Sequence, residues 1–345
     1  NLINTNIESF KKLIKPEQLI HKFPLNNKIE QFIINSRKEI ESILNKSLNK
    51  KIIIVGPCSI HNIEEAKVYG QFLKTIISKV KDKICIVMRV YFEKPRTNIG
   101  WKGLINDPNL DNTFDVNKGI SQARELLLYL NSIEIPCAYE ILDTITPQYI
   151  SDLISWGAIG ARTSESQVHR QIVSGLSMPV GYKNSTNGSI NGAINGIISS
   201  SHTQCFTGIT NLGEPAIITT KGNKYTHIIL RGSDSGPNYS KEHIDRYELL
   251  LKDNKLNLNI MVDCSHGNSQ KDYKNQKNVI SDVITQIQNG NKSIIGIMIE
   301  SNIYEGSQKL TNENKTNLKY GVSITDSCIN IEETGTHILN LYEIL

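Results

Sequence analysis

Residues 51–58 read KIIIVGPC, a short apolar run that ends in a glycine, a proline and a cysteine. Because the isoleucines and the valine are consecutive, the run is typical of a parallel strand buried on both faces. The next residues, 63–80, carry apolar side chains at helical spacing. Together the two segments predict one strand–helix unit of a parallel α/β fold.

The same unit recurs along the chain. Strands are expected at 51–57, 84–90, 136–141, 158–162, 179–183, 227–232, 259–265 and 294–300. Helices are expected at 63–80, 116–133, 146–156, 164–176, 189–201, 241–253, 277–290 and within 328–345. Eight alternations favour a closed (β/α)8 TIM barrel.

Two segments do not fit the alternation. Residues 1–48 precede the first strand and are predicted to form an arm and one helix. Residues 204–222 contain two β-like stretches around NLGEP, which predicts a β-hairpin inserted before the sixth strand. We therefore expect an N-terminal extension and one decorated catalytic barrel over 49–345.

Composition narrows the class of protein. The net charge of +4 is spread along 345 residues, which argues against a nucleic-acid partner. No apolar run approaches the length of a membrane span, and the first residues lack the apolar core of a signal peptide. Six cysteines without a CxxC pair suit reduced thiols and a cytoplasmic location.

Chemistry-bearing residues gather where the expected strands end. In a TIM barrel these ends form the active-site face. The strand-end residues are Cys58, Arg89, Glu140, Arg162, Lys183, Arg231, His266 and Glu300. One such residue alone would suit a surface charge, but eight on one rim indicate a site.

The cations among them predict an anion site. Arg89, Arg162, Lys183 and Arg231 would repel one another unless an anion with more than one charge lay between them. Because the sequence has no GxxxxGK[ST] or GxGxxG motif, a small phosphorylated carboxylic acid fits better than a nucleotide.

The remaining strand ends predict a metal site. Barrel closure places the last strand beside the first, so Cys58, His266 and Glu300 become neighbours. Asp326 is expected at the same rim, where it also caps the last helix. This mixed ligand set suits one divalent ion, Mn²⁺, Fe²⁺, Co²⁺ or Zn²⁺. The simpler alternatives are a buried inert thiol at Cys58 and a plain N-cap at Asp326.

The segment YFEKPRTNIGWKG at 91–103 follows the second strand at the same rim. Arg96 and the hydroxyl of Thr97 can hold a second phosphate, and Lys94 can reach inward as an acid or electrostatic partner. A solvated basic loop is the alternative.

Several long motifs resemble type I 3-deoxy-D-arabino-heptulosonate 7-phosphate (DAHP) synthases of the feedback-regulated microbial kind. They include GPCSIHN, MRVYFEKPRTNIGWKG, AYEILDTITPQ, VDCSHGNSQKDY and KYGVSITDSCI. The resemblance implies condensation of phosphoenolpyruvate with erythrose 4-phosphate, the first step of the shikimate pathway. It also implies a divalent metal on Cys58, His266, Glu300 and Asp326.

Substrate roles follow from the same resemblance. Arg89, Arg162, Lys183 and Arg231 match positions that bind phosphoenolpyruvate. Arg96 and Thr97 match the erythrose 4-phosphate positions, and Lys94 lies between the substrates. Candidates to position or deprotonate the attacking water are Glu140, Lys183 and His266.

In the family, the arm and hairpin build subunit contacts and an inhibitor pocket, which implies a homodimer or homotetramer and an aromatic amino acid effector. The matching residues are Asp143, Pro147, Gln148, Ser177 and Phe206. Asp143 and Gln148 would equally suit a plain helix start.

The chain departs from the family pattern at Asn62, Ser185, Asn187 and the longer stretch RGSDSGPNY at 231–239. Two other functions remain open: a related barrel that uses arabinose 5-phosphate, and a barrel without catalysis that serves as a regulatory subunit.

Overall fold

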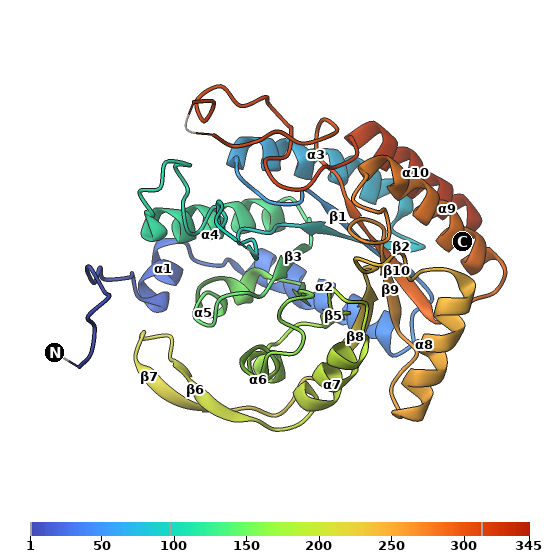
Figure 1. Ribbon diagram of the computed structural model, residues 1–345, viewed down its shortest axis with the longest axis horizontal. Coiled ribbons are helices and arrows are strands. Elements are labelled where there is room, and N and C mark those ends of the chain that lie inside the picture. Colours follow the sequence, from blue (N-terminus) through green and yellow to red (C-terminus); the bar gives the residue numbers. More distant parts are fainter. Residues whose placement is uncertain (1, 97, 312) are drawn as a thin grey trace.

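A computed structural model describes residues 2–96, 98–311 and 313–345, and the prediction for Thr97 lies outside these residues. The fold is a closed barrel of parallel strands with helices around it (Figure 1), which confirms the predicted (β/α)8 class. In spatial order the strands are β1 (Lys51–Gly56), β10 (Ile294–Glu300), β9 (Ile260–Asp263), β8 (Thr226–Leu230), β5 (Val180–Lys183), β4 (Trp156–Ile159), β3 (Cys137–Glu140) and β2 (Ile84–Arg89).

Closure depends on the pairing of the first and last strands of the barrel. β1 pairs with β10 from Ile52 opposite Gly296 to Gly56 opposite Glu300. A Cβ atom at Gly296 would lie 1.9 Å from the carbonyl oxygen of Ile52. Only glycine therefore permits this close approach, and the pairing brings Glu300 next to the loop that carries Cys58.

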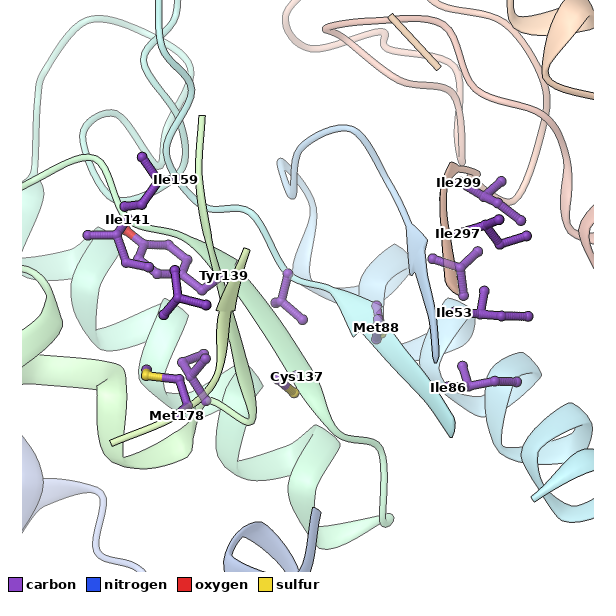
Figure 2. Packing of buried hydrophobic residues seen from close by; sticks show 14 of the residues in the cluster. Ile53, Ile86, Met88, Cys137, Tyr139, Ile141, Ile159, Met178, Ile297 and Ile299 are labelled. Carbon is purple, nitrogen blue, oxygen red and sulfur yellow. The ribbon is translucent and has the colours of Figure 1, made fainter. Parts of the chain in front are cut away.

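The strands separate two apolar regions. Side chains such as Ile52, Ile54 and Trp156 fill the barrel interior. Their neighbours, including Ile53 and Tyr139, pack outward against the helices (Figure 2). The surrounding helices are α3 (Ile63–Val80), α4 (Val116–Ser132), α6 (Gln167–Gly175), α7 (Asn191–Ser200), α8 (Lys241–Asp253), α9 (Gln276–Gln288) and α10 (Ile331–Ile344).

The region 146–162 differs from the prediction. The expected helix at 146–156 is reduced to α5 (Pro147–Ile150) and the 3-10 turn η1 (Ser151–Leu153), and the next strand occupies 156–159 instead of 158–162. Trp156 explains the shift, because it is fully buried in the barrel and its indole N–H donates to His227 at 3.0 Å. Tertiary burial thus takes Trp156 into the strand.

The N-terminal extension contains two helices where one was predicted, α1 (Pro16–Lys22) and α2 (Asn27–Leu44). They are separate because Asn26 caps α2, its side chain accepting the N–H of Ile29 at 2.9 Å. The end of α2 packs Ile40 and Leu44 against the interior cluster, which closes the N-terminal mouth of the barrel.

The predicted hairpin is present as the antiparallel pair β6 (Cys205–Ile209) and β7 (Pro215–Thr219), which precedes β8. It projects from the barrel beside α1 (Figure 1), and the N–H of Glu17 donates to the carbonyl of Asn211 at 2.9 Å. Within the described residues, no helix is both long enough and apolar enough to cross a membrane.

Candidate active site

A cavity of about 530 Å³ opens at the C-terminal ends of the barrel strands. Its lining residues lie at or just after the C-terminal ends of the strands β2, β3, β4, β5, β8, β9 and β10, as the sequence predicts for this face. The predicted site residues that line it are Lys94, Arg96, Glu140, Arg162, Lys183, Arg231, His266 and Asp326. Cys58, Arg89 and Glu300 are not part of the lining, since they are fully buried beneath it.

Three proposed metal ligands converge, with Asp326 in the cavity wall and Cys58 and Glu300 buried beneath it. One ligand atom each from Cys58, Glu300 and Asp326 lie within 4.8 Å of one another. The Cys58 sulfur is 3.6 Å from Oδ2 of Asp326. Burial, followed by the charge of Glu300, raises the pKa of the Cys58 thiol to about 12. A thiolate at this position therefore needs a compensating cation.

His266 completes this group from the connection that follows β9. Its Nε2 lies 3.7 Å from Oε1 of Glu300 and 4.0 Å from Oδ2 of Asp326. Its Nδ1 lies 2.9 Å from Oδ2 of Asp263. A carboxylate that holds one imidazole nitrogen while the other faces the ligands is the usual support of a metal-binding histidine. The donor set and its support therefore fit one divalent ion.

Sequence reasoning missed Asp263. It is fully buried and contacts Lys183 as well, with Nζ of Lys183 2.9 Å from Oδ2. Burial opposes its charge, but His266 and Lys183 hold the pKa of Asp263 well below its usual range. The sequence contained a signal for it, because Asp263 ends the apolar run IMVD at 260–263. A charged side chain buried in such a strand needs partners of opposite charge.

Arg89 is not in the cavity lining with the other predicted cations. Its guanidinium donates to Oε1 of Glu300 at 3.1 Å and lies over the ring of Tyr91. Burial alone would raise the pKa of the Glu300 carboxyl group. The positive charges of His266, Arg89 and Lys94 outweigh burial and lower that pKa to about 2. In the structure Arg89 thus acts first as the partner of a proposed metal ligand.

The cavity itself has a strongly cationic wall. Arg162 follows β4, Lys183 ends β5 and Arg231 follows β8, and Glu140 faces the same space. Lys94 reaches from the other side, and its Nζ donates to the carbonyl of Cys58 at 3.1 Å. Burial alone would lower the pKa of Lys94, but the surrounding anionic groups raise it, so Lys94 stays protonated.

Comparisons with known proteins agree with this geometry. Residues 31–339 match the sequence model of the DAHP synthetase I family. The chain belongs to the DAHP synthetase I family. It is 47% identical over 342 residues to the Tyr-sensitive phospho-2-dehydro-3-deoxyheptonate aldolase of Escherichia coli K12, covering 99% of this chain and 96% of the relative.

Two further relatives extend the match. The Phe-sensitive aldolase of the same organism is 48% identical over 335 residues, covering 97% of this chain and 95% of the relative. The solved structure of the corresponding aldolase from Francisella tularensis SCHU S4 superposes with a TM-score of 0.95 at 48% identity and 98% coverage of both chains. The similarity to this DAHP synthetase I structure includes the barrel and nearly all of its additions.

Most residues that were matched to an inhibitor pocket line a second cavity of about 470 Å³. Pro147, Gln148, Ser177 and Phe206 contribute to its wall, together with Ile218 of the hairpin. Asp143 is not part of the wall, and its Oδ1 accepts the N–H groups of Ile145 and Thr146. Asp143 therefore shapes the turn into α5, the simpler of its two predicted roles.

The residues that depart from the family pattern make local hydrogen bonds. Asn62 caps α3 by accepting the N–H groups of Glu64 and Glu65. Ser185 donates to Asn187 at 2.6 Å. The longer stretch at 231–239 forms a tight turn in which the N–H of Ser233 donates to Gly236. All of these contacts leave the cavity lining described above in place.

Asp326 does not cap the last helix, and that prediction is wrong. The cap of α10 is Asn330, whose side chain accepts the N–H of Glu333 at 2.9 Å. The chain makes a bridge between Ser301 and Ile329 first, which leaves Asp326 at the rim beside Cys58.

Proposed function

We propose that the chain catalyses the metal-dependent condensation of phosphoenolpyruvate, erythrose 4-phosphate and water to DAHP and phosphate. Membership of the DAHP synthetase I family supports the reaction. The observation that carries the proposal is a cavity with a cationic wall beside a cluster of one thiol, one imidazole and two carboxylates, of which the thiol and one carboxylate lie buried beneath the cavity. These are the groups that two phosphorylated substrates and a divalent ion require.

Phosphoenolpyruvate suits the wall formed by Arg162, Lys183 and Arg231, because its carboxylate and phosphate carry several negative charges. Arg96, at the other side of the cavity, suits the phosphate of erythrose 4-phosphate. This arrangement would hold the nucleophilic carbon of phosphoenolpyruvate near the aldehyde. Positioning of this kind accounts for much of the acceleration of a bimolecular step.

The metal would be held by Cys58, His266, Glu300 and Asp326. When bound, it supplies a Lewis acid that polarises the aldehyde. Lys94 is protonated and lines the cavity, so it can donate to the aldehyde oxygen as negative charge develops there. Water then adds to carbon two of the former phosphoenolpyruvate, and phosphate leaves by cleavage of its C–O bond. Glu140, Lys183 and His266 line the cavity and are the groups that can handle the proton of that water.

An aromatic amino acid is the proposed effector, and the second cavity is its proposed site. The supporting observations are the apolar and polar wall of that cavity and the Tyr- and Phe-sensitive names of the relatives. We further infer a homodimer or homotetramer in the cytoplasm. Exposed apolar residues of the arm, such as Ile3 and Phe10, and Ile217 of the hairpin support the subunit contact.

Phosphate release with both substrates tests the reaction. Activity should disappear after treatment with a chelator and return with Mn²⁺, Fe²⁺, Co²⁺ or Zn²⁺. Arabinose 5-phosphate in place of erythrose 4-phosphate should give little product, and one aromatic amino acid should inhibit. Metal-loaded protein that releases no more phosphate than a sample without enzyme would overturn the proposal.

A further inference from the structure

A buried hydrogen bond joins the base of the Lys94 loop to strand β3. The hydroxyl of Tyr139 donates to Oε2 of Glu93. Glu93 is 5% exposed and Tyr139 is 2% exposed. The ring of Tyr139 lies in the apolar region between barrel and helices, near Ile141 and Ile159 (Figure 2), and also packs against Phe92. Neither Glu93 nor Tyr139 lines the cavity.

Each partner directly precedes a residue of the active site. Lys94 follows Glu93, and Glu140 follows Tyr139; both following residues line the cavity. Lys94 is fixed at one end by its bond to the carbonyl of Cys58 and by its own N–H, which donates to Lys102 at 2.9 Å. The Glu93–Tyr139 hydrogen bond fixes the same segment on its buried side, away from the cavity. It thus connects the segments that carry two cavity-lining side chains, Lys94 after β2 and Glu140 at the end of β3.

A carboxyl group in this position has a cost. Burial is the main reason that the pKa of Glu93 is raised to about 7, with Asp143 and Glu140 adding to the rise and the Tyr139 bond opposing it. No salt bridge to a cation reaches Glu93 among the residues that the structure describes. An apolar side chain would avoid this cost, so a buried carboxyl here suits a role in fixing geometry.

We propose that Glu93 and Tyr139 are positioning residues, whose hydrogen bond sets the placement of Lys94 and Glu140 in the cavity. The inference rests on the condensation proposed above. It assigns a function to two residues that touch neither the substrates nor the proposed metal.

The sharpest test is Tyr139→Phe, which removes only the hydroxyl. We expect kcat with both substrates to fall roughly 10- to 100-fold, since small displacements of catalytic groups have effects of this size. The KM for phosphoenolpyruvate should change by less than about twofold, because Arg162, Lys183 and Arg231 lie at the ends of other strands, β4, β5 and β8. Glu93→Gln retains an acceptor and should keep most of the activity, whereas Glu93→Leu should match Tyr139→Phe. The double variant Tyr139→Phe/Glu93→Leu should be no worse than either single variant.

Tyr149→Phe is the matched control. Its hydroxyl also makes a hydrogen bond from a buried ring, to the carbonyl of Ile14 at 2.6 Å, but outside the site. It should leave kcat unchanged. If Tyr139→Phe also leaves kcat unchanged, or if it lowers activity only in proportion to the loss of folded protein, the inference is wrong.

Hydrogen exchange separates this inference from the proposed reaction, because it needs no turnover. Tyr139→Phe should accelerate exchange of the Lys94 amide about tenfold or more and leave the amides of β1 and β10 unchanged. An unchanged Lys94 amide would overturn the positioning role even in an active enzyme. Accelerated exchange in a chain that releases no phosphate would support the mechanical role and refute the proposed reaction alone.

Discussion

The sulfur of Cys58 lies 3.6 Å from Oδ2 of Asp326, although 268 residues separate them in sequence. The N–H of Asp326 also points to this sulfur at 3.4 Å. The contact exists because β10 closes the barrel against β1 and the chain then returns along the rim before α10 begins. The proposed metal site is therefore a product of barrel closure and not of any local motif.

Replacing Cys58 should abolish metal binding and activity together. Cys58→Ala removes the one soft ligand of the group, so we expect loss of the bound divalent ion and a fall in kcat of at least about 100-fold. Metal content and phosphate release measure the two effects. Cys205→Ala removes an exposed thiol of the hairpin and should change neither. Full metal content in Cys58→Ala would show that this thiol is not a ligand.

The Arg89–Glu300 pair should be important for stability. Both side chains are fully buried, so Arg89→Leu would leave the Glu300 carboxylate without its partner. We expect a loss of about 3–5 kcal/mol in the free energy of unfolding, measured in urea without metal. Lys67→Met breaks the surface pair with Glu64 and should cost about 1 kcal/mol or less. Equal losses in the two variants would contradict the importance assigned to burial.

His227 should make the fold sensitive to acid. Burial lowers its pKa to about 4, although the hydrogen bond from Nδ1 to the carbonyl of Ile228 opposes this shift. The folded protein therefore holds a neutral ring, whose Nε2 accepts the indole N–H of Trp156. In the unfolded chain His227 binds a proton below about pH 6.5, whereas in the folded protein it does so only near pH 4. The contribution of the neutral ring to the free energy of unfolding is therefore complete above about pH 6.5 and is lost progressively down to about pH 4. The expected contribution is about 3 kcal/mol.

Urea unfolding of His227→Gln at pH 7 and pH 5 measures this term. The variant should lose less stability between the two pH values than the unmodified protein. His202→Gln, which changes an exposed histidine of the α7–β6 connection, serves as the control and should retain the full pH dependence. If His227→Gln also retains it, other groups are responsible.

Gly103 should be required for the loop that carries Lys94. Its φ is +117°, and an added Cβ atom would lie 2.0 Å from the carbonyl oxygen of Phe92. Gly103→Ala should therefore displace the loop and reduce kcat by about tenfold or more. Gly290→Ala has a positive φ as well, but its Cβ would meet nothing within 4 Å. Both variants place alanine at a positive φ, but only Gly103→Ala adds a collision with the backbone. Similar kcat values for the two variants would therefore refute the steric argument.

The hairpin offers a paired test of the effector site. Phe206 lies opposite Ile218 across the two strands, and both contribute to the second cavity, whereas Ile217 points outward and is 79% exposed. Phe206→Ala should weaken inhibition by the effective aromatic amino acid by about tenfold, with kcat unchanged. Ile217→Ala should keep the inhibition. The comparison uses initial rates measured at increasing concentrations of the amino acid. Unchanged inhibition of Phe206→Ala together with weakened inhibition of Ile217→Ala would place the effector elsewhere.

Sequence reasoning was most successful where apolar runs are long. The run ending at Glu300 predicts its strand because every residue in it is buried. The same argument misplaces the strand near Trp156, because a large aromatic side chain joined the barrel interior through its contact with His227. The local pattern of apolar residues gives no information about a contact with a residue as distant in sequence as His227.

The site was predictable as a set of strand ends, but not in its internal pairing. Arg89 and Arg231 look equivalent in the sequence, yet Arg89 contacts Glu300 while Arg231 lines the cavity. Asp263 and the Glu93–Tyr139 bond also depend on which faces of different strands meet. Those relationships appear only once the register of the barrel is known.

Barrel closure has a consequence for biosynthesis. A chain that emerges from the ribosome exposes Cys58 early, and 268 further residues must be translated before Asp326 can approach it. A nascent chain that ends before Asp326 lacks one of the four proposed ligands. Tight binding of the ion would therefore follow closure of the barrel and would not assist the early steps of its folding.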